Sequence, residues 1–163
     1  MSETGLRIAS AETASDLADI KALFRAYAAS LSVDLAYQDF EAELATLPGK
    51  YAPPGGSLLL ARDGQGRAIG CVALRPLDAA AAEMKRLYVA PGARGLGLGQ
   101  ALVHAVCAAA RKAGYNEIRL DTLPEMRSAQ KLYHVLGFGP VPAYYETPVA
   151  GTVFLGKRLL NDR

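Results

Sequence analysis

Apolar residues recur along the chain with two spacings, which predict helices and strands. Steps of three and four over residues 17–31 predict an amphipathic helix of about four turns, with Ser15 as its cap and Asp16 in its first turn. A shorter helix is expected over residues 39–47, where a Pro-Gly pair ends it. Short apolar runs between turn residues predict strands. The expected strands cover residues 6–9, 57–63, 68–75, 83–89, 117–121 and 152–160, with a hairpin turn at 64–67.

Two more helices are expected in the second half of the chain. The first covers residues 100–113, with Leu98, Leu102 and Val106 on its apolar face and Cys107 on another side. The second begins at residues 123–125 and ends before a Gly-Phe-Gly turn. Because a strand, a helix and another strand follow one another between positions 83 and 121, we expect a right-handed, parallel βαβ unit. The fold class is therefore α+β, in a single domain over residues 1–163.

The expected strand at residues 83–89 carries three charged side chains. Strand alternation places Glu83, Lys85, Leu87 and Val89 on one face and Met84, Arg86 and Tyr88 on the other. Two explanations of the charges stay open. Either one face is exposed to solvent, or the charges serve the loop that follows the strand.

Composition and charge exclude several classes of protein. About half of the 163 residues are apolar and the net charge is +2, which is ordinary for a globular domain and gives no support for nucleic-acid binding. No apolar run approaches the ~20 residues of a membrane span, and residues 1–7 lack a signal-peptide pattern. Cys71 and Cys107 lack metal-ligand spacing, so we expect two reduced, packed thiols and no metal site. A soluble, cytoplasmic protein follows.

Three glycines alternate at positions 95, 97 and 99, just where the long second-half helix should begin. Glycine lets the backbone turn tightly and approach a ligand closely. The first N–H groups of a helix have no partner within it, and the helix dipole favours an anion at that end. The loop therefore predicts a cradle for a phosphate or pyrophosphate.

Three kinds of nucleotide site could use such a cradle. A P-loop is excluded, because Gln100 and Ala101 stand where it needs a lysine and a hydroxyl. A dinucleotide fold is disfavoured, because Gln100 replaces the third glycine and residues 90–93 separate the strand from the loop. Asp121 at the end of the next strand imitates the ribose-binding acid of that fold, so this interpretation stays open.

The third interpretation comes from a family resemblance. The run Arg94-Gly95-Leu96-Gly97-Leu98-Gly99 resembles the R/Q-x-x-G-x-G/A signature of the GNAT superfamily of acyl-CoA-dependent N-acetyltransferases. Residues 87–91 resemble the strand before that loop, and residues 129–138 resemble the family's A-x-x-L-Y…GF helix and turn. The first half of the chain fits by element order alone. The resemblance implies a three-layer α/β arrangement, with a mixed, mostly antiparallel, twisted sheet, a splayed central parallel pair and about four flanking helices.

The resemblance also implies an activity and a set of residues. The reaction is direct transfer of an acetyl group from acetyl-CoA to an amine, with coenzyme A as product and no metal. Tyr133 matches the tyrosine that protonates the leaving thiolate, and Glu83 is our candidate general base, with a water relay as the alternative. Met126 stands where many members carry an asparagine that contacts the cofactor arm. The implied cofactor-binding residues are Leu87, Tyr88, Val89, Arg94, Gly95, Leu96, Gly97, Leu98, Gly99 and Gln100.

The acyl acceptor is defined less sharply. Lys85 and Arg86, with Tyr51 and with Tyr144 or Tyr145, are candidate substrate contacts for a small acid that also carries an amine. We expect the acceptor to be an amino acid, metabolite or xenobiotic. A protein or peptide acceptor, and a non-catalytic acyl-CoA sensor, stay open. A homodimer also stays open, since members of the family often pair.

Overall fold

The computed structural model describes residues 5–159, so residues 1–4 and Leu160, at the end of the last expected strand, lie outside it. Within that range one mixed sheet has the strand order β1-β2-β3-β4-β5-β7-β6. All neighbouring strands in it are antiparallel except β4 and β5, which are parallel. The strands are β1 (Arg7–Ser10), β2 (Ser57–Arg62), β3 (Ala68–Pro76), β4 (Ala81–Val89), β5 (Glu117–Thr122), β6 (Gly139–Pro140) and β7 (Val153–Arg158).

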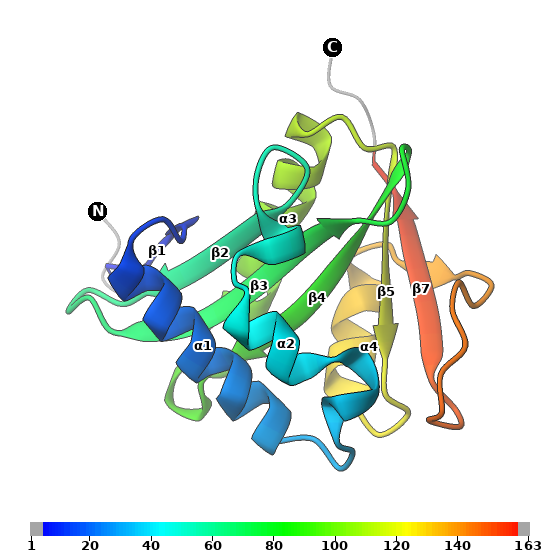
Figure 1. Ribbon diagram of the computed structural model, residues 1–163, viewed down its shortest axis with the longest axis horizontal. Helices are drawn as coiled ribbons and strands as arrows, with labels where there is room; N and C mark the ends of the chain where they lie inside the picture. The colour runs from blue at the N-terminus through cyan, green and yellow to red at the C-terminus, as the bar shows by residue number, and fades with distance from the viewer. Residues whose placement is uncertain (1–4, 160–163) are drawn as a thin grey trace.

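Helices cover both faces of the sheet (Figure 1). The described helices are α1 (Ala14–Ala29), α2 (Phe40–Ala45), α3 (Leu98–Lys112) and α4 (Arg127–Val135), with 3₁₀ turns η1 (Leu35–Gln38), η2 (Gly49–Tyr51) and η3 (Pro91–Ala93). In Figure 1, α1 and α2 lie in front of the sheet and α3 and α4 lie behind it. The predicted three-layer fold with a central parallel pair is confirmed.

Helices α1, α3 and α4 begin at other residues than predicted, because hydrogen bonds and turns at the helix ends set the first residue, and the apolar spacing does not record them. Thr13, not Ser15, caps α1, because the Thr13 hydroxyl accepts from the Asp16 N–H and the Asp16 carboxylate accepts from the Thr13 N–H. Helix α3 begins two residues earlier than predicted, at Leu98, because Gly97 supplies the left-handed turn before it. Helix α4 begins later than residues 123–125, at Arg127.

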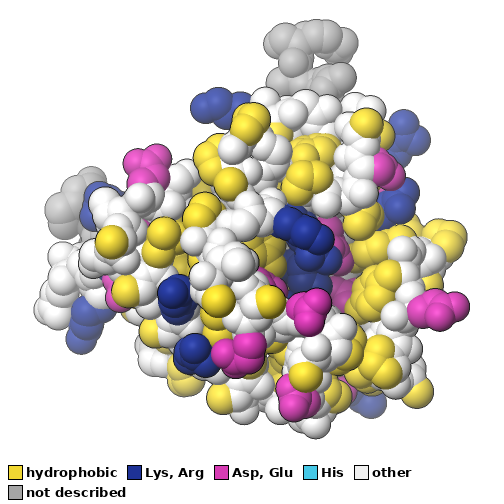
Figure 2. Space-filling view, in the orientation of Figure 1, with side chains coloured by type: hydrophobic (Ala, Val, Ile, Leu, Met, Phe, Trp, Pro, Cys, Tyr) yellow, Lys and Arg dark blue, Asp and Glu magenta, His cyan; other side chains and the backbone are white. Residues whose placement is uncertain are grey.

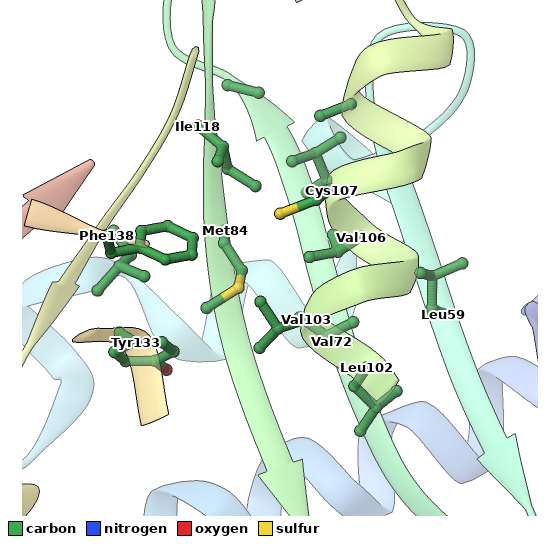
Figure 3. Close-up of a cluster of buried hydrophobic side chains, with 14 of the residues drawn as sticks. Leu59, Val72, Met84, Leu102, Val103, Val106, Cys107, Ile118, Tyr133 and Phe138 are labelled. Carbon is green, nitrogen blue, oxygen red and sulfur yellow. The ribbon is translucent and has the colours of Figure 1, made fainter. Parts of the chain in front are cut away.

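Two hydrophobic cores fill the spaces on either side of the sheet. Val103, Val106 and Cys107 of α3 pack on Met84 and Ile118 in the first core (Figure 3). The second core joins α1 and α2 to β2 and β3 and includes Cys71. Both cysteines are buried and free, as predicted, and Cys107 lies on the buried face of α3, which is wider than the predicted apolar face.

The parallel strands β4 and β5 pair over a short length only. Their register runs from Ala81 opposite Glu117 to Glu83 opposite Arg119, and no pairing follows. Beyond that point the two strands separate toward their carboxyl ends (Figure 1). Since β4 stays paired with β3, and β5 with β7, the gap opens inside the sheet rather than at its edge.

A β-bulge in β4 lies beside this gap. Cys71 opposes Tyr88 and Ala73 opposes Lys85, so β4 has one residue more than β3 between these pairs. Arg86 adopts a φ of 61°, which is uncommon for any residue other than glycine. The bulge breaks the alternation, so the predicted grouping of Lys85 with Leu87 and Val89 on one face is wrong.

The side chains of β4 sort into new groups as a result. Lys85, Arg86 and Tyr88 lie on the side of α1 and α2, as the neighbours of Arg86 and Tyr88 show. Met84, Leu87 and Val89 pack on the side of α3. The bulge therefore places two consecutive cationic residues on the same face.

Candidate active site

The glycine loop presents a row of free N–H groups at the start of α3. Gly95 and Gly97 have φ values of 83° and 79°, and a Cβ at either position would meet nothing within 4 Å. Within residues 5–159, the backbone N–H groups of residues 95–100 find no acceptor, and α3 has no side-chain cap. Six consecutive donors at a helix N-terminus, with open space before them, form a site for a diphosphate-like anion.

The residues around the loop contribute in different ways. Arg94 turns back, so that its Nε donates to the Val89 carbonyl at 2.9 Å and its guanidinium lies over the Tyr88 ring. Leu98 is buried in the core and can offer a ligand its N–H only, whereas Leu96 is 70% exposed. A Cβ at Gly99 would lie 3.4 Å from Leu132, so the loop adjoins α4.

The end of β4 turns a backbone edge toward the gap, where the Val89 carbonyl accepts from Arg94 Nε and no strand pairs with it. The Ala90 N–H donates to the Ile69 carbonyl of β3, so alternation turns the N–H and C=O groups of Leu87 and Val89 away from β3. In that direction β5 no longer pairs with β4. An extended ligand lying in the gap could therefore bond to Leu87 and Val89 as an added strand does.

A cleft opens where the two strands separate. Helix α1 and turn η1 line one side of it, and the start of α4 lines the other. Tyr133 and Met126 of α4 line it, as do Lys85 and Leu87 of β4. The predicted acid thus shares one cavity with three predicted contacts, Lys85, Arg86 and Leu87.

Tyr133 is buried beside Phe138, with the ring centroids 5.7 Å apart (Figure 3). Its hydroxyl has no hydrogen bond to any described residue, although the residue lines the cleft. Burial raises the pKa of Tyr133 well above its ordinary value. The phenol therefore stays protonated at neutral pH and can donate to a ligand atom.

Thr122 ends β5 and lines the same cleft. Its side chain is buried, and Oγ1 has no hydrogen-bond partner within the described residues. Leaving a buried hydroxyl unpaired costs about 1–3 kcal/mol, so a ligand atom that bonds to Thr122 would recover that cost. No pattern in the sequence distinguishes Thr122 from an ordinary strand residue.

Glu83 is 1% exposed, and its carboxylate is already bonded on both oxygens. Oε1 accepts from Arg75 Nε at 2.9 Å, and Oε2 accepts from the Tyr144 hydroxyl at 2.8 Å. Glu83 does not line the cleft. Glu83 is the last residue of β4 that pairs with β5, but its oxygens face Arg75 and Tyr144, and its role as a base stays a prediction.

Lys85 and Asp121 face each other across the cleft wall. Lys85 Nζ lies 3.8 Å from Asp121 Oδ1 and 3.9 Å from Glu83 Oε2, and its side chain is 5% exposed. Burial lowers the pKa of Lys85, against the raising effects of Asp121 and Glu83. The other oxygen of Asp121 accepts from the Tyr145 hydroxyl. Figure 2 shows basic and acidic side chains close together near the middle of the face on which α1 and α2 lie.

Arg86 is buried and bonded to Glu43, which lies 43 residues earlier in the sequence. Its Nε and Nη2 donate to the two oxygens of Glu43 at 3.0 and 2.7 Å, and Nη1 donates to Gln38 at 2.8 Å. The Phe40 ring lies 5.3 Å from the guanidinium carbon. These bonds hold the bulge and commit Arg86 to protein partners.

The two predicted tyrosine contacts lie outside the lining of the cleft. Tyr51 is 2% exposed and donates to Glu43 at 2.9 Å, and it lines a different cavity from the one that holds Tyr133. Tyr144 packs on Tyr145 and Phe154 above Glu83. Neither tyrosine lines the cleft between β4 and β5. The aromatic residues that do line it besides Tyr133 are Tyr27 and Tyr37, which the sequence did not single out.

Two features are absent from the described part of the chain. Within residues 5–159, no group of three His, Cys, Asp or Glu side chains could bind a metal ion. Among the same residues no helix has both the length and the apolar character that a membrane crossing requires.

Comparisons with known proteins agree with the fold and the loop. An uncharacterized N-acetyltransferase of Schizosaccharomyces pombe is 39% identical over 156 residues, covering 95% of this chain and 96% of the relative. An acetyltransferase structure from Streptococcus agalactiae, 23% identical, has a TM-score of 0.79 over 95% of this chain and 99% of that one. A Salmonella typhimurium protein solved with acetyl-CoA, 19% identical, has a TM-score of 0.68 over 97% and 96% of the two chains.

These two structures are too distant in sequence to show more than the fold, whereas the yeast relative and the family model go further. The model described as the acetyltransferase (GNAT) family matches residues 18–138, which is more than half of the chain. The matched range includes the glycine loop, both strands of the cleft and Tyr133. The chain belongs to the acetyltransferase (GNAT) family and is an acyltransferase enzyme.

Proposed function

We propose that this enzyme transfers an acetyl group from acetyl-CoA to the amine of a small molecule. The observation that carries the proposal is the row of free N–H groups at residues 95–100, which suits the pyrophosphate of coenzyme A. When bound, acetyl-CoA supplies the acetyl group as a thioester. The Salmonella typhimurium protein of the same fold was solved with this molecule, which supports the assignment.

Residues of this chain suit each part of the cofactor. The N–H groups of the loop are proposed to hold the pyrophosphate. The backbone edge at Leu87 and Val89, which no strand covers, is proposed to hold the extended arm. Thr122 offers an unpaired hydroxyl in the cleft, where Met126 offers no polar group. Thr122 can therefore replace the polar contact that Met126 lacks.

The chemical step needs proton transfers at both reacting ends. The amine arrives protonated, loses one proton before it attacks and the second as the C–N bond forms and the C–S bond breaks. One of these two protons neutralises the leaving thiolate, and the other passes to solvent. Tyr133 is proposed to donate to the leaving sulfur, since its hydroxyl is protonated and unpaired in the cleft. Burial in the same cleft also raises the pKa of the leaving thiol, so the thiol pKa comes closer to the raised pKa of the Tyr133 phenol.

The lining of the cleft supports a small acceptor. Residues of α1, η1, β4, β5 and α4 surround it. Tyr144 donates to the buried carboxylate of Glu83, and Tyr145 donates to the half-buried carboxylate of Asp121 in the cleft wall. A folded protein tail would have to displace these bonds, whereas a small molecule would not.

The test is thiol release from acetyl-CoA with a broad panel of small amines. The wild type should turn over at least one amine, and Tyr133→Phe should lower kcat by about 10²–10⁴-fold with little change in acetyl-CoA affinity by calorimetry. Tyr115→Phe is the matched control, because Tyr115 bonds to the Gly55 carbonyl outside the cleft and its removal should leave kcat unchanged. Turnover of peptides alone, or cofactor binding without any turnover, would contradict the proposal.

A further inference from the structure

One cation and one anion in the cleft keep unused hydrogen-bonding capacity. Lys85 Nζ has no hydrogen bond to any residue in the described part of the chain, and its two ion-pair distances of 3.8 and 3.9 Å exceed hydrogen-bond length. Asp121 Oδ1 has only this long contact to Lys85, since Tyr145 bonds to Oδ2. Both residues line the cleft.

The neighbouring charged groups have no such capacity. Arg86 also lines the cleft, but its guanidinium is bonded to Glu43 and Gln38. Glu83 is bonded to Arg75 and Tyr144 and does not line the cleft. Among the described residues, the ionic contacts left for a ligand in this cleft are therefore one ammonium and one carboxylate, 3.8 Å apart.

We propose that Lys85 and Asp121 form a site for a zwitterionic acceptor, a small amino acid whose carboxylate binds Lys85 and whose ammonium binds Asp121. The inference rests on the proposed N-acetyltransferase function and names the acceptor class of that same site. Thr122 and Tyr133 line the same cleft, so an amine held at Asp121 lies in the cavity that contains the proposed acid.

Charge balance favours a zwitterion over simpler ligands. Burying a charge without a partner is costly, and a buried ion pair is tolerated only when both members are compensated. A zwitterion adds no net charge and gives each of Lys85 and Asp121 an opposite charge at hydrogen-bond distance. An amine without a carboxylate would bring a second cation close to Lys85 and leave its three N–H donors unused.

The experiment compares matched acceptors in the thiol-release assay. The panel contains each common α-amino acid, its carboxamide and its decarboxylated amine. With the wild type, kcat/KM for the best amino acid should exceed that of its carboxamide by tenfold or more. Lys85→Gln should remove this preference through a higher KM for the acid, with a clearly smaller loss for the carboxamide. Lys112→Gln, an exposed lysine at the far end of α3, is the control and should keep the preference.

The pH dependence gives a second measurement that a structural role of Lys85 would not produce. Because the pKa of Lys85 is lowered, its positive charge is present at low pH and is lost as pH rises, sooner than for an ordinary lysine. The KM for the amino acid should therefore rise with pH already below the ordinary lysine pKa of about 10.4 in the wild type. Lys85→Arg keeps its charge over this range and should show a flatter profile with the same acceptor.

The outcomes separate this inference from the function on which it rests. Amines turned over equally well with and without a carboxylate would overturn the zwitterion site and leave the acetyltransferase proposal standing. An equal loss for acid and carboxamide in Lys85→Gln would also overturn it. Failure of every amine in the panel would instead contradict the proposed function. The wild-type comparison needs no variant, so poor folding of Lys85→Gln would not remove the test.

Discussion

The glycine loop at residues 95–100 and the charged stretch of β4 at residues 83–86 serve one candidate site, and they are built in opposite ways. The loop offers backbone N–H groups, and its conformation depends on residues next to one another in the chain. The charged stretch offers side chains that are almost wholly buried. Their partners lie elsewhere in the chain, at Glu43, Asp121 and Tyr144.

This difference changes what each region can tolerate. A backbone site survives most side-chain changes that keep the glycine conformation, because its donors belong to the main chain. A buried ionic site fails when a single partner is removed, because the remaining charge has no solvent to compensate it. We therefore expect the largest stability effects in the charged stretch and the smaller, more binding-specific effects in the loop.

The largest expected effect is at Glu43, the partner of Arg86. Glu43→Gln leaves the Arg86 guanidinium, whose side chain is 2% exposed, without a counter-charge and should lower the free energy of unfolding by about 3–5 kcal/mol. Glu41→Gln is the matched control two residues away in α2, because Glu41 pairs with Arg25 at the surface over 3.6 Å. It should change stability by no more than about 1 kcal/mol. Urea unfolding measures both, and equal losses would break the contrast between buried and exposed pairs.

A smaller effect is expected in the loop, at Gly97. Gly97→Ala meets no neighbouring atom, but it forces a residue with a Cβ into a φ of 79°, which costs about 1–2 kcal/mol. Gly92→Ala is the control, since its surroundings are equally open and its φ is not in the left-handed region. We expect Gly97→Ala to weaken coenzyme A binding by about tenfold in calorimetry, in step with that strain. Equal affinities for the two variants would show that the loop geometry is not what holds the ligand.

The same contrast explains how much could be predicted from the sequence. The glycine spacing, the following helix and the βαβ order are local patterns, and the structure confirms the loop, α3 and the parallel pair. The bulge at Arg86 could not be predicted, because a non-glycine residue with positive φ is held there by Glu43 and Gln38 from distant segments. Strand alternation therefore assigned Lys85 to the wrong group.

Asp121 shows how a correct observation can receive the wrong meaning. The sequence marked it as an imitation of a ribose-binding acid, and the structure places it beside Lys85 in the cleft between β4 and β5. Its pairing with Tyr145 depends on a connection 24 residues away, with no local signal. Buried partners of this kind come from tertiary packing, which periodicity and motifs do not record.

The smallest expected effect is at Thr122 of β5, and it tests whether this side chain binds the cofactor together with the backbone groups. Thr122→Val keeps the shape of the side chain and removes a buried hydroxyl that has no partner within residues 5–159. The free protein should therefore become more stable, by up to about 1 kcal/mol in thermal or urea unfolding. If Thr122 bonds to the bound cofactor, the same change should weaken acetyl-CoA binding by about three- to tenfold, because a hydrogen bond contributes about 0.5–1.5 kcal/mol. The stability gain and the affinity loss have opposite signs, so one experiment on each distinguishes them. Unchanged affinity would show that Thr122 does not bond to the cofactor. A loss of stability in the free protein would show that Oγ1 already has a partner there.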